Sequence, residues 1–182
     1  MKFIKKYGVT LEKLTPQKIE IVRQWRNDPK IDKYMEFHEE ITPQMQENWF
    51  NRINNDNNLY YIIQYEGNDI GLINIKDLND ELTEGESGCF IYEDKYLNRD
   101  ISYRAHLALY DYFFNEFNGK GLKSHIKEDN PRASRFAQFL GFSLLDDSRT
   151  EYHLSKEEYE NNKNRQRFVL REKKLQNKQS YE

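Results

Sequence analysis

The feature that most limits the fold of this chain is the order in which helical and strand-like hydrophobic patterns alternate along it. Pro16, Pro43 and Pro131 each follow a Thr or Asn that can cap a helix, so they mark three helix starts. Between the helices lie short runs rich in aromatic and β-branched residues, which are typical of strands. The resulting order, β, α, α, β, β, β, α, β, α, β, β, predicts a mixed α/β (α+β) domain on one central sheet.

The element boundaries follow from the same patterns. The longest helix is expected over 101–117, where apolar residues recur at helical spacing, and another is expected to end at Gly141, a left-handed C′ position. Gly67-Asn68 is expected to form a hairpin turn. Strands are expected near the N-terminus and at 59–65, 70–75, 87–92, 122–127, 142–145 and 150–154.

Composition restricts the class of protein. The chain has 182 residues, enough for one domain with a core, and its net charge of −3 indicates neither a nucleic-acid nor a membrane partner. No apolar run is long enough to span a bilayer. The single cysteine, Cys89, cannot form an internal disulfide, and the four histidines lack ligand-like spacing, so we expect no metal site. We therefore expect a soluble, cytoplasmic protein.

The C-terminal segment differs from the rest. Residues 1–155 are expected to form the domain, and 156–182 a charged tail that is helical or partly disordered. Ser155 and Glu158 have the spacing of a capping box. The apolar cluster at 168–170 can dock the tail on the domain, and an exposed strand edge adds a second surface for self-association or a protein partner.

Several stretches, taken in order, resemble one known family. Residues 25–29 read Trp-Arg-Asn-Asp-Pro, residues 96–102 read Tyr-Leu-Asn-Arg-Asp-Ile-Ser, and 130–142 run from Asn130 to a Leu-Gly-Phe ending, with a further match at 151–158. Over roughly residues 8–160 the chain resembles the GNAT superfamily of acyl-CoA N-acyltransferases. The stretches at 25–29 and 151–158 resemble the branch that contains ribosomal-protein acetyltransferases and the enzymes that acetylate nucleotide-linked 4-amino sugars.

The resemblance implies the GNAT fold, a mixed central sheet of about six or seven strands flanked by about four helices, and acetyl-CoA as co-substrate. In the family, glycines before the long helix let the backbone approach the pyrophosphate, and free N–H groups at the helix start bind it. Here Asn98 and Asp100 occupy the glycine positions. We expect the Asp100 carboxylate to cap the helix and use up these donors, and Arg99 to supply a compensating cation. The implied cofactor-binding residues are Phe90, Ile91, Arg99, Asp100, Ile101, Ser102, Tyr103 and Asn130.

Acetyl transfer needs a base for the amine and an acid for the departing thiolate. The family uses a carboxylate near the fourth strand and a tyrosine in the later helix, but Ala137 stands at that tyrosine position. Glu86, with Glu84 beside it, is the candidate base. Tyr152 is the candidate acid, with Tyr92 as the alternative.

Arg26 and Asn27 lie at a helix end beside a turn, where polar groups often determine specificity, and are the candidate substrate-binding residues. Two functions stay open. The first is an N-acetyltransferase acting on a primary amine, with an amino-sugar nucleotide or other small amine preferred to a protein α-amine. The second is a catalytically inactive GNAT-fold protein that serves as a structural or protein-binding module. An enzyme should keep free N–H groups at 99–103 facing an open cleft, whereas an inactive relative should have the cleft filled.

Overall fold

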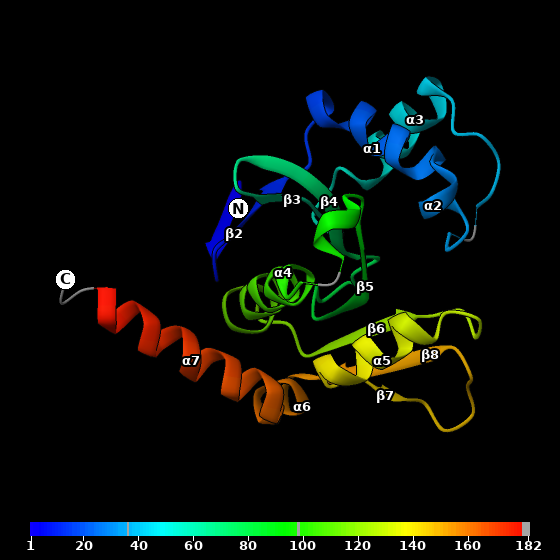
Figure 1. Ribbon diagram of the computed structural model, residues 1–182. Helices are drawn as coiled ribbons and strands as arrows, with labels where there is room; N and C mark the ends of the chain where they lie inside the picture. The colour runs from blue at the N-terminus through cyan, green and yellow to red at the C-terminus, as the bar shows by residue number, and fades with distance from the viewer. Residues whose placement is uncertain (36, 98, 180–182) are drawn as a thin grey trace.

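The computed structural model describes residues 1–35, 37–97 and 99–179, and within them the strands form one eight-stranded sheet in the order β1-β2-β3-β4-β5-β6-β8-β7 (Figure 1). Neighbouring strands are antiparallel except β5 and β6, which run parallel. The strands are β1 (Phe3–Lys6), β2 (Val9–Lys13), β3 (Leu59–Tyr65), β4 (Asn68–Lys76), β5 (Glu84–Ile91), β6 (Gly121–His125), β7 (Ser143–Leu144) and β8 (Glu151–Ser155). This is the mixed sheet that the sequence predicts.

Two turns account for the extra strand and for the earlier start of β4. Tyr7 and Gly8 have φ values of 55° and 76°, which folds the N-terminal segment into two strands and gives the sheet one strand more than expected. Glu66 and Gly67 form the next hairpin turn with φ values of 49° and 78°, so Asn68 already belongs to β4 rather than to the turn.

The helices are α1 (Ile19–Asn27), α2 (Pro29–Asp32), α3 (Pro43–Ile53), α4 (Ile101–Asp111), α5 (Pro131–Leu140), α6 (Lys156–Asn161) and α7 (Lys163–Gln179). A π-helical turn at Tyr112–Glu116 prolongs α4. The side chains of Thr42 and Asn130 cap α3 and α5 as predicted, and Gly141 is left-handed with φ 108°. Thr15 makes no side-chain cap, because a short 3-10 turn at Pro16–Lys18 precedes α1.

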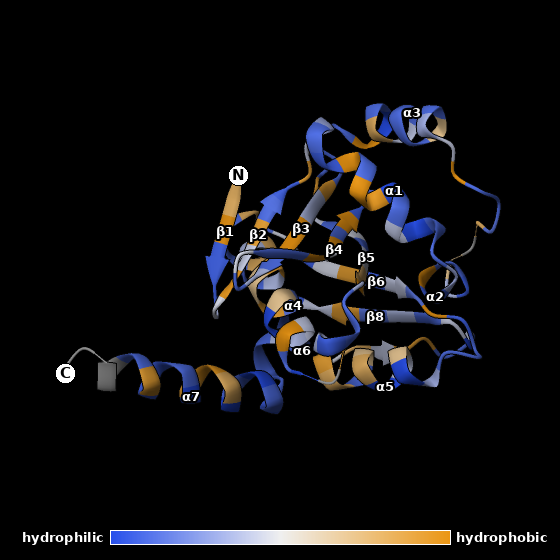
Figure 2. Cartoon of the chain, turned by 45° about the horizontal axis from the view of Figure 1, so that its top comes forward, coloured by the Kyte–Doolittle hydropathy of each residue, from blue (hydrophilic) through white to orange (hydrophobic). Residues whose placement is uncertain are grey.

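Helices cover both faces of the sheet. Helix α4 packs on one face within the larger core cluster, while α1 and α3 pack on the other through a smaller cluster that includes Trp25, Phe50 and Leu72. In Figure 2 the part of α7 that leaves the body is mostly hydrophilic, with separate apolar residues. Within α7, Phe168 is 7% exposed and Leu170 is 58% exposed, so the helix docks chiefly through Phe168.

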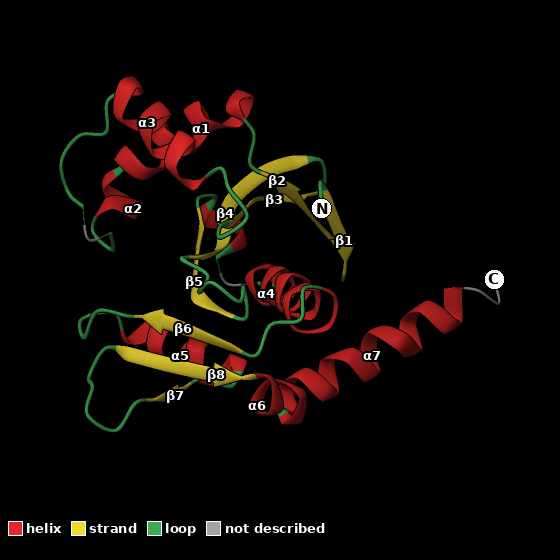
Figure 3. Cartoon of the chain, turned by 180° about the vertical axis from the view of Figure 1, so that it is seen from behind, coloured by secondary structure: helices red, strands yellow, loops and turns green. Residues whose placement is uncertain are grey.

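The sheet divides between its two parallel strands. β5 pairs with β6 only from Glu84↔Gly121 to Glu86↔Lys123, and from there to Ile91 it pairs with β4 alone. Figure 3 shows β6, β8 and α5 separating from the rest of the sheet at this point. The edge of β5 at residues 87–91 therefore has backbone groups without a strand partner, and a cleft opens beside it.

Candidate functional site

The cleft between β5 and β6 contains a cavity of about 880 Å³. Its walls come from α2, β5, one face of α4, the end of β6 and α5. A space of this size is typical of small-molecule sites. The cleft is therefore open rather than filled by side chains.

One side of the cavity is formed by Ser102, His106 and Tyr110, which follow each other at i, i+4 and i+8 on one face of α4. The Tyr110 hydroxyl and the Ser87 hydroxyl of β5 share a hydrogen bond of 2.7 Å. His106 Nδ1 lies 2.7 Å from the Ser102 carbonyl oxygen, so Nδ1 must carry the proton. Burial lowers the pKa of His106 to about 4, which leaves the imidazole neutral near pH 7.

The start of α4 keeps its hydrogen-bond donors. Within the described residues, the N–H groups of 101–103 have no acceptor. The Asp100 side chain makes no cap and instead contacts Arg104 at 3.0 Å and Arg171 at 3.3 Å. The hydrogen bond from Arg104 contributes most to holding the pKa of Asp100 below its usual value. The prediction that Asp100 caps the helix is therefore wrong, and the other glycine position, Asn98, lies outside the described residues.

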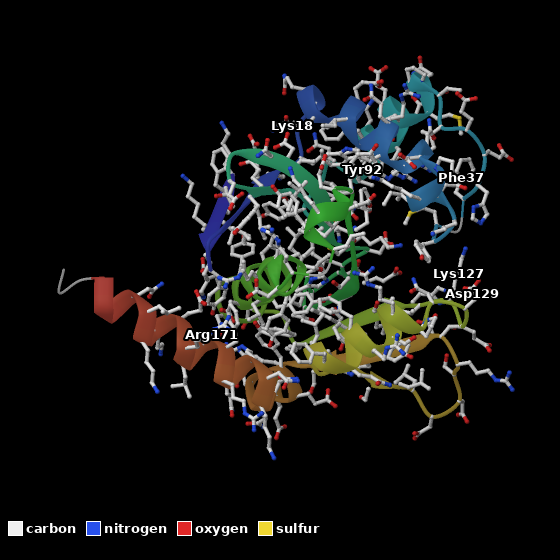
Figure 4. All side chains as sticks on the ribbon, viewed as in Figure 1. Lys18, Phe37, Tyr92, Lys127, Asp129 and Arg171 are labelled. Atoms are coloured by element: carbon white, nitrogen blue, oxygen red, sulfur yellow. The ribbon has the colours of Figure 1, made fainter. Side chains whose placement is uncertain are left out.

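The cleft is basic although the chain as a whole is slightly acidic. Two acidic residues, Glu86 and Asp94, line it. Six basic residues line it as well: Lys30, Lys33, Arg99, Lys127, Arg132 and Arg135. Lys127 Nζ donates a hydrogen bond to the Met35 carbonyl, which links the loop after β6 to the segment after α2. Figure 4 shows Lys127 facing the segment that carries Phe37, across the mouth of the cleft.

Most of the residues predicted for the site lie on the cleft or beside it. Ile101 is an exception among the cofactor residues, since it is buried in the core. The predicted residues that line the cleft are Glu86, Phe90, Ile91, Arg99, Ser102 and Asn130, while Asp100 and Tyr103 line a neighbouring groove that also includes Arg99. Tyr152 is 5% exposed and packs in the core on β8, outside the cavity lining. Ala137 does line the cavity, and it offers no hydroxyl there.

The predicted substrate-binding pair supports the helical layer above the sheet. The Asn27 amide binds both backbone groups of Ile41, donating to the carbonyl and accepting from the N–H, each at 2.9 Å. Arg26 lies 5.3 Å from the Trp49 ring, and burial lowers its pKa. Neither residue lines the cavity. Their direct contact with substrate stays a prediction.

The sequence contained a signal for some of the residues that were missed. Ser102, His106 and Tyr110 have helical spacing that can be read from the sequence, and none belongs to the apolar stripe expected for this helix. The basic residues come from α2, α5 and three connecting segments, so no local pattern joins them. In the ranges 1–35, 37–97 and 99–179, no group of three or more His, Cys, Asp or Glu residues could hold a metal ion, and no helix is long and apolar enough to cross a membrane.

The chain matches one family model and several solved structures. Residues 9–143 match the family model described as an acetyltransferase (GNAT) domain. No curated protein matches the chain. A solved domain from Methanocaldococcus jannaschii is 21% identical, with a TM-score of 0.69, and the match covers 81% of this chain and 97% of that one.

Two solved enzymes share the fold at lower identity. The spermidine N-acetyltransferase of Vibrio cholerae, in complex with CoA and spermine, is 18% identical with a TM-score of 0.73, covering 85% of this chain and 99% of that one. An aminoglycoside acetyltransferase in complex with coenzyme A and kanamycin is 16% identical with a TM-score of 0.72, covering 84% and 97%. At these identities the similarity establishes the fold.

Proposed function

Since the chain belongs to the GNAT acetyltransferase family, we propose that it transfers an acetyl group from acetyl-CoA to a primary amine on a small molecule. The observation that carries this proposal is the open cleft between β5 and β6, together with the start of α4, where the N–H groups of 101–103 have no acceptor among the described residues. Such a helix start attracts anions, because its N–H groups and the helix dipole both favour negative charge. An inactive relative would not need to keep either feature.

The residues present fit acetyl-CoA. The N–H groups of 101–103 and the Arg99 side chain can hold the pyrophosphate, and the strand edge at 87–91 offers backbone groups to an extended chain. Acetyl-CoA, when bound, supplies the acetyl group as an activated thioester. The protein then has to position the amine and manage two protons.

We assign the two protons to residues that line the cleft. Glu86 lies on β5, paired with Lys76 at 3.1 Å, and its carboxylate can accept the proton of the incoming amine. Tyr110 holds a proton on its hydroxyl, because burial raises the pKa of this phenol above its usual value. It can supply the proton needed at the leaving sulfur. We assign this role to Tyr110 rather than Tyr152, because only Tyr110 reaches the cavity.

The charge of the cleft favours an acceptor that is itself anionic. Lys30, Lys33 and Lys127 stand at the end of the cavity formed by α2 and the loop after β6. A polycation such as spermidine would be repelled there, whereas a phosphate or diphosphate attached to the amine would be attracted. We therefore place nucleotide-linked amino sugars first among the acceptors.

The test is isothermal titration with acetyl-CoA at modest ionic strength, followed by assays of thiol release. The acceptor panel contains nucleotide-linked amino sugars, polyamines, an aminoglycoside and peptides with free N-termini. Micromolar binding and acetylation of an anionic amine would support the proposal. Absence of binding at millimolar acetyl-CoA would contradict it and favour a binding module.

A further inference from the structure

A second cavity, of about 480 Å³, lies beside the main cleft and depends on the C-terminal helix. It is bounded by the start of α4, the outer side of α5 and one face of α7. We call it the α7 groove; its lining includes Arg99, Tyr103, Phe139, Arg167, Phe168 and Arg171. Arg99 and Phe136 line both cavities, so the α7 groove adjoins the main cleft at the start of α4.

Helix α7 lies outside residues 9–143, the segment that the family model matches. Its residues Asn164, Arg167, Phe168 and Arg171 recur at i, i+3, i+4 and i+7 and share one face. Phe168 anchors this face, with its ring 5.4 Å from those of both Tyr7 and Tyr103. Figure 4 shows Arg171 on the side of α7 that faces the rest of the molecule.

The lining of the α7 groove points to a phosphorylated aromatic ligand. Three arginines, Arg99, Arg167 and Arg171, face one aspartate, Asp100, so the groove is electropositive. Among the described residues Arg167 has no acidic partner. Phe139 is a large aromatic side chain that is 45% exposed, and exposed aromatic rings of this kind can stack on a base.

Tyr103 supplies a second, independent observation. Its side chain is 6% exposed and lines the groove, yet its buried hydroxyl has no hydrogen-bond partner in the described part of the chain. A buried hydroxyl without a partner is costly, and a polar ligand in the groove would remove that cost. Packing of Phe168 explains why α7 docks, but it explains neither the Arg167 charge nor the exposed Phe139 ring.

We propose that the α7 groove binds the phosphorylated adenosine end of acetyl-CoA, with Arg167 and Arg171 pairing with its 3′-phosphate and Phe139 contacting the adenine. This inference rests on the proposed function. It makes the C-terminal helix part of the co-substrate site. Helix α7 also supplies cations, such as Arg171, close to the negative charge of Asp100.

Binding affinities test this proposal without any measurement of turnover. Arg167→Ala is the main variant, because Arg167 makes no ion pair within the described residues and its loss should not unfold the chain. Lys173→Ala is the matched control, since it removes the same charge from an exposed residue of α7 outside the groove. Each protein is titrated with CoA, dephospho-CoA and adenosine 3′,5′-bisphosphate.

We expect Arg167→Ala to bind CoA and the bisphosphate about tenfold more weakly, because one charge-assisted contact is lost. Its affinity for dephospho-CoA and the behaviour of Lys173→Ala should match the wild type. If Arg167→Ala binds all three ligands as the wild type does, the α7 groove proposal is overturned while the proposed function stands. If the bisphosphate binds in an Arg167-dependent way but no amine is acetylated, the groove stands and the proposed function fails. If the wild type binds none of the ligands, both are overturned.

Discussion

Burial determines the chemical state of two residues on the cleft wall, His106 and Tyr110. Burial lowers the pKa of the imidazole to about 4 and raises the pKa of the phenol, so near neutral pH both groups are uncharged. Only the phenol can then give up a proton, because the one proton on neutral His106 is used in its contact with the Ser102 carbonyl. Two predictions follow, one for Tyr110 in acetyl transfer and one for His106 in stability.

Tyr110→Phe should lower kcat for acetyl transfer by roughly 10²- to 10³-fold, the usual effect of losing a general acid. The KM for acetyl-CoA should change little, since the hydroxyl is bonded to Ser87 and is not part of the proposed anion site. Initial rates with varied acetyl-CoA measure both constants. Tyr152→Phe is the competing variant: if it abolishes turnover and Tyr110→Phe does not, the assignment to Tyr110 is wrong.

His106 should make the folded chain less stable in mild acid. The unfolded chain takes up a proton near the ordinary His value of 6.5, whereas folded His106 resists protonation until about pH 4. Protonation therefore favours the unfolded state between these values, and the free energy of unfolding should fall by on the order of 2–3 kcal/mol from pH 6.5 to 4. Urea titrations across this range test it. The fall in the free energy of unfolding should be smaller in His106→Asn. The control His38→Gln alters an exposed histidine and should show the same fall as the wild type.

At the scale of elements, the start of α4 combines free donors with a carboxylate that turns away from them. Asp100 is occupied by one arginine from its own helix, Arg104, and one from α7, Arg171. The carboxylate still carries charge beside the N–H groups of 101–103. It therefore opposes an incoming phosphate by repulsion and by holding Arg171.

Asp100→Gly should strengthen binding of acetyl-CoA several-fold, because it removes this negative charge and the ion pair with Arg171, while Arg104 stays bonded to Tyr7 and Glu172. Asp100→Asn separates the charge from the backbone effect of glycine. Calorimetric titration of the three proteins measures the change. Affinity that stays the same or weakens in both variants would show that Asp100 does not oppose the ligand.

At the scale of the whole molecule, one buried carboxylate joins the two ends of the chain. Asp111 at the end of α4 receives contacts from Lys6 at 2.7 Å and Tyr7 at 2.6 Å in the N-terminal hairpin. It also receives contacts from Tyr159 of α6 and Arg165 of α7, each at 2.8 Å. Burial alone would raise the pKa of Asp111, but these hydrogen bonds hold it below its usual value. The contacts attach the helices that follow the matched segment to the body of the domain.

Asp111→Asn should destabilise the fold by about 3–5 kcal/mol, since it removes the charge that pairs with Lys6 and Arg165 and leaves a single amide oxygen to accept from four donors. Chemical denaturation at pH 7 measures the loss. The matched control is Asp147→Asn in the exposed turn before β8, which should change stability by less than about 0.5 kcal/mol. Equal stability of Asp111→Asn and wild type would mean that the cluster is not a structural junction.

Features that depend on near neighbours could be predicted from the amino-acid sequence. Thr42, Asn130 and Gly141 act at helix ends as predicted, because caps and left-handed glycines depend on residues only a few positions away. The order of elements was enough to predict a mixed sheet, and the three matching stretches were enough to identify the family. The resemblance, rather than any local pattern, pointed to Phe90, Ile91, Arg99 and Ser102, which line the cleft.

Contacts between groups far apart in the sequence could be read from the folded molecule alone. Asp100 was expected to cap its helix, but its carboxylate pairs with Arg104 of the same helix and with Arg171, which lies 71 positions away and cannot be inferred from an isolated helix start. Tyr152 was expected at the site, but its register between β6 and β7 turns it into the core. The cleft itself exists because pairing of β5 with β6 stops at Glu86, and pairing between strands distant in sequence is not set by local residues.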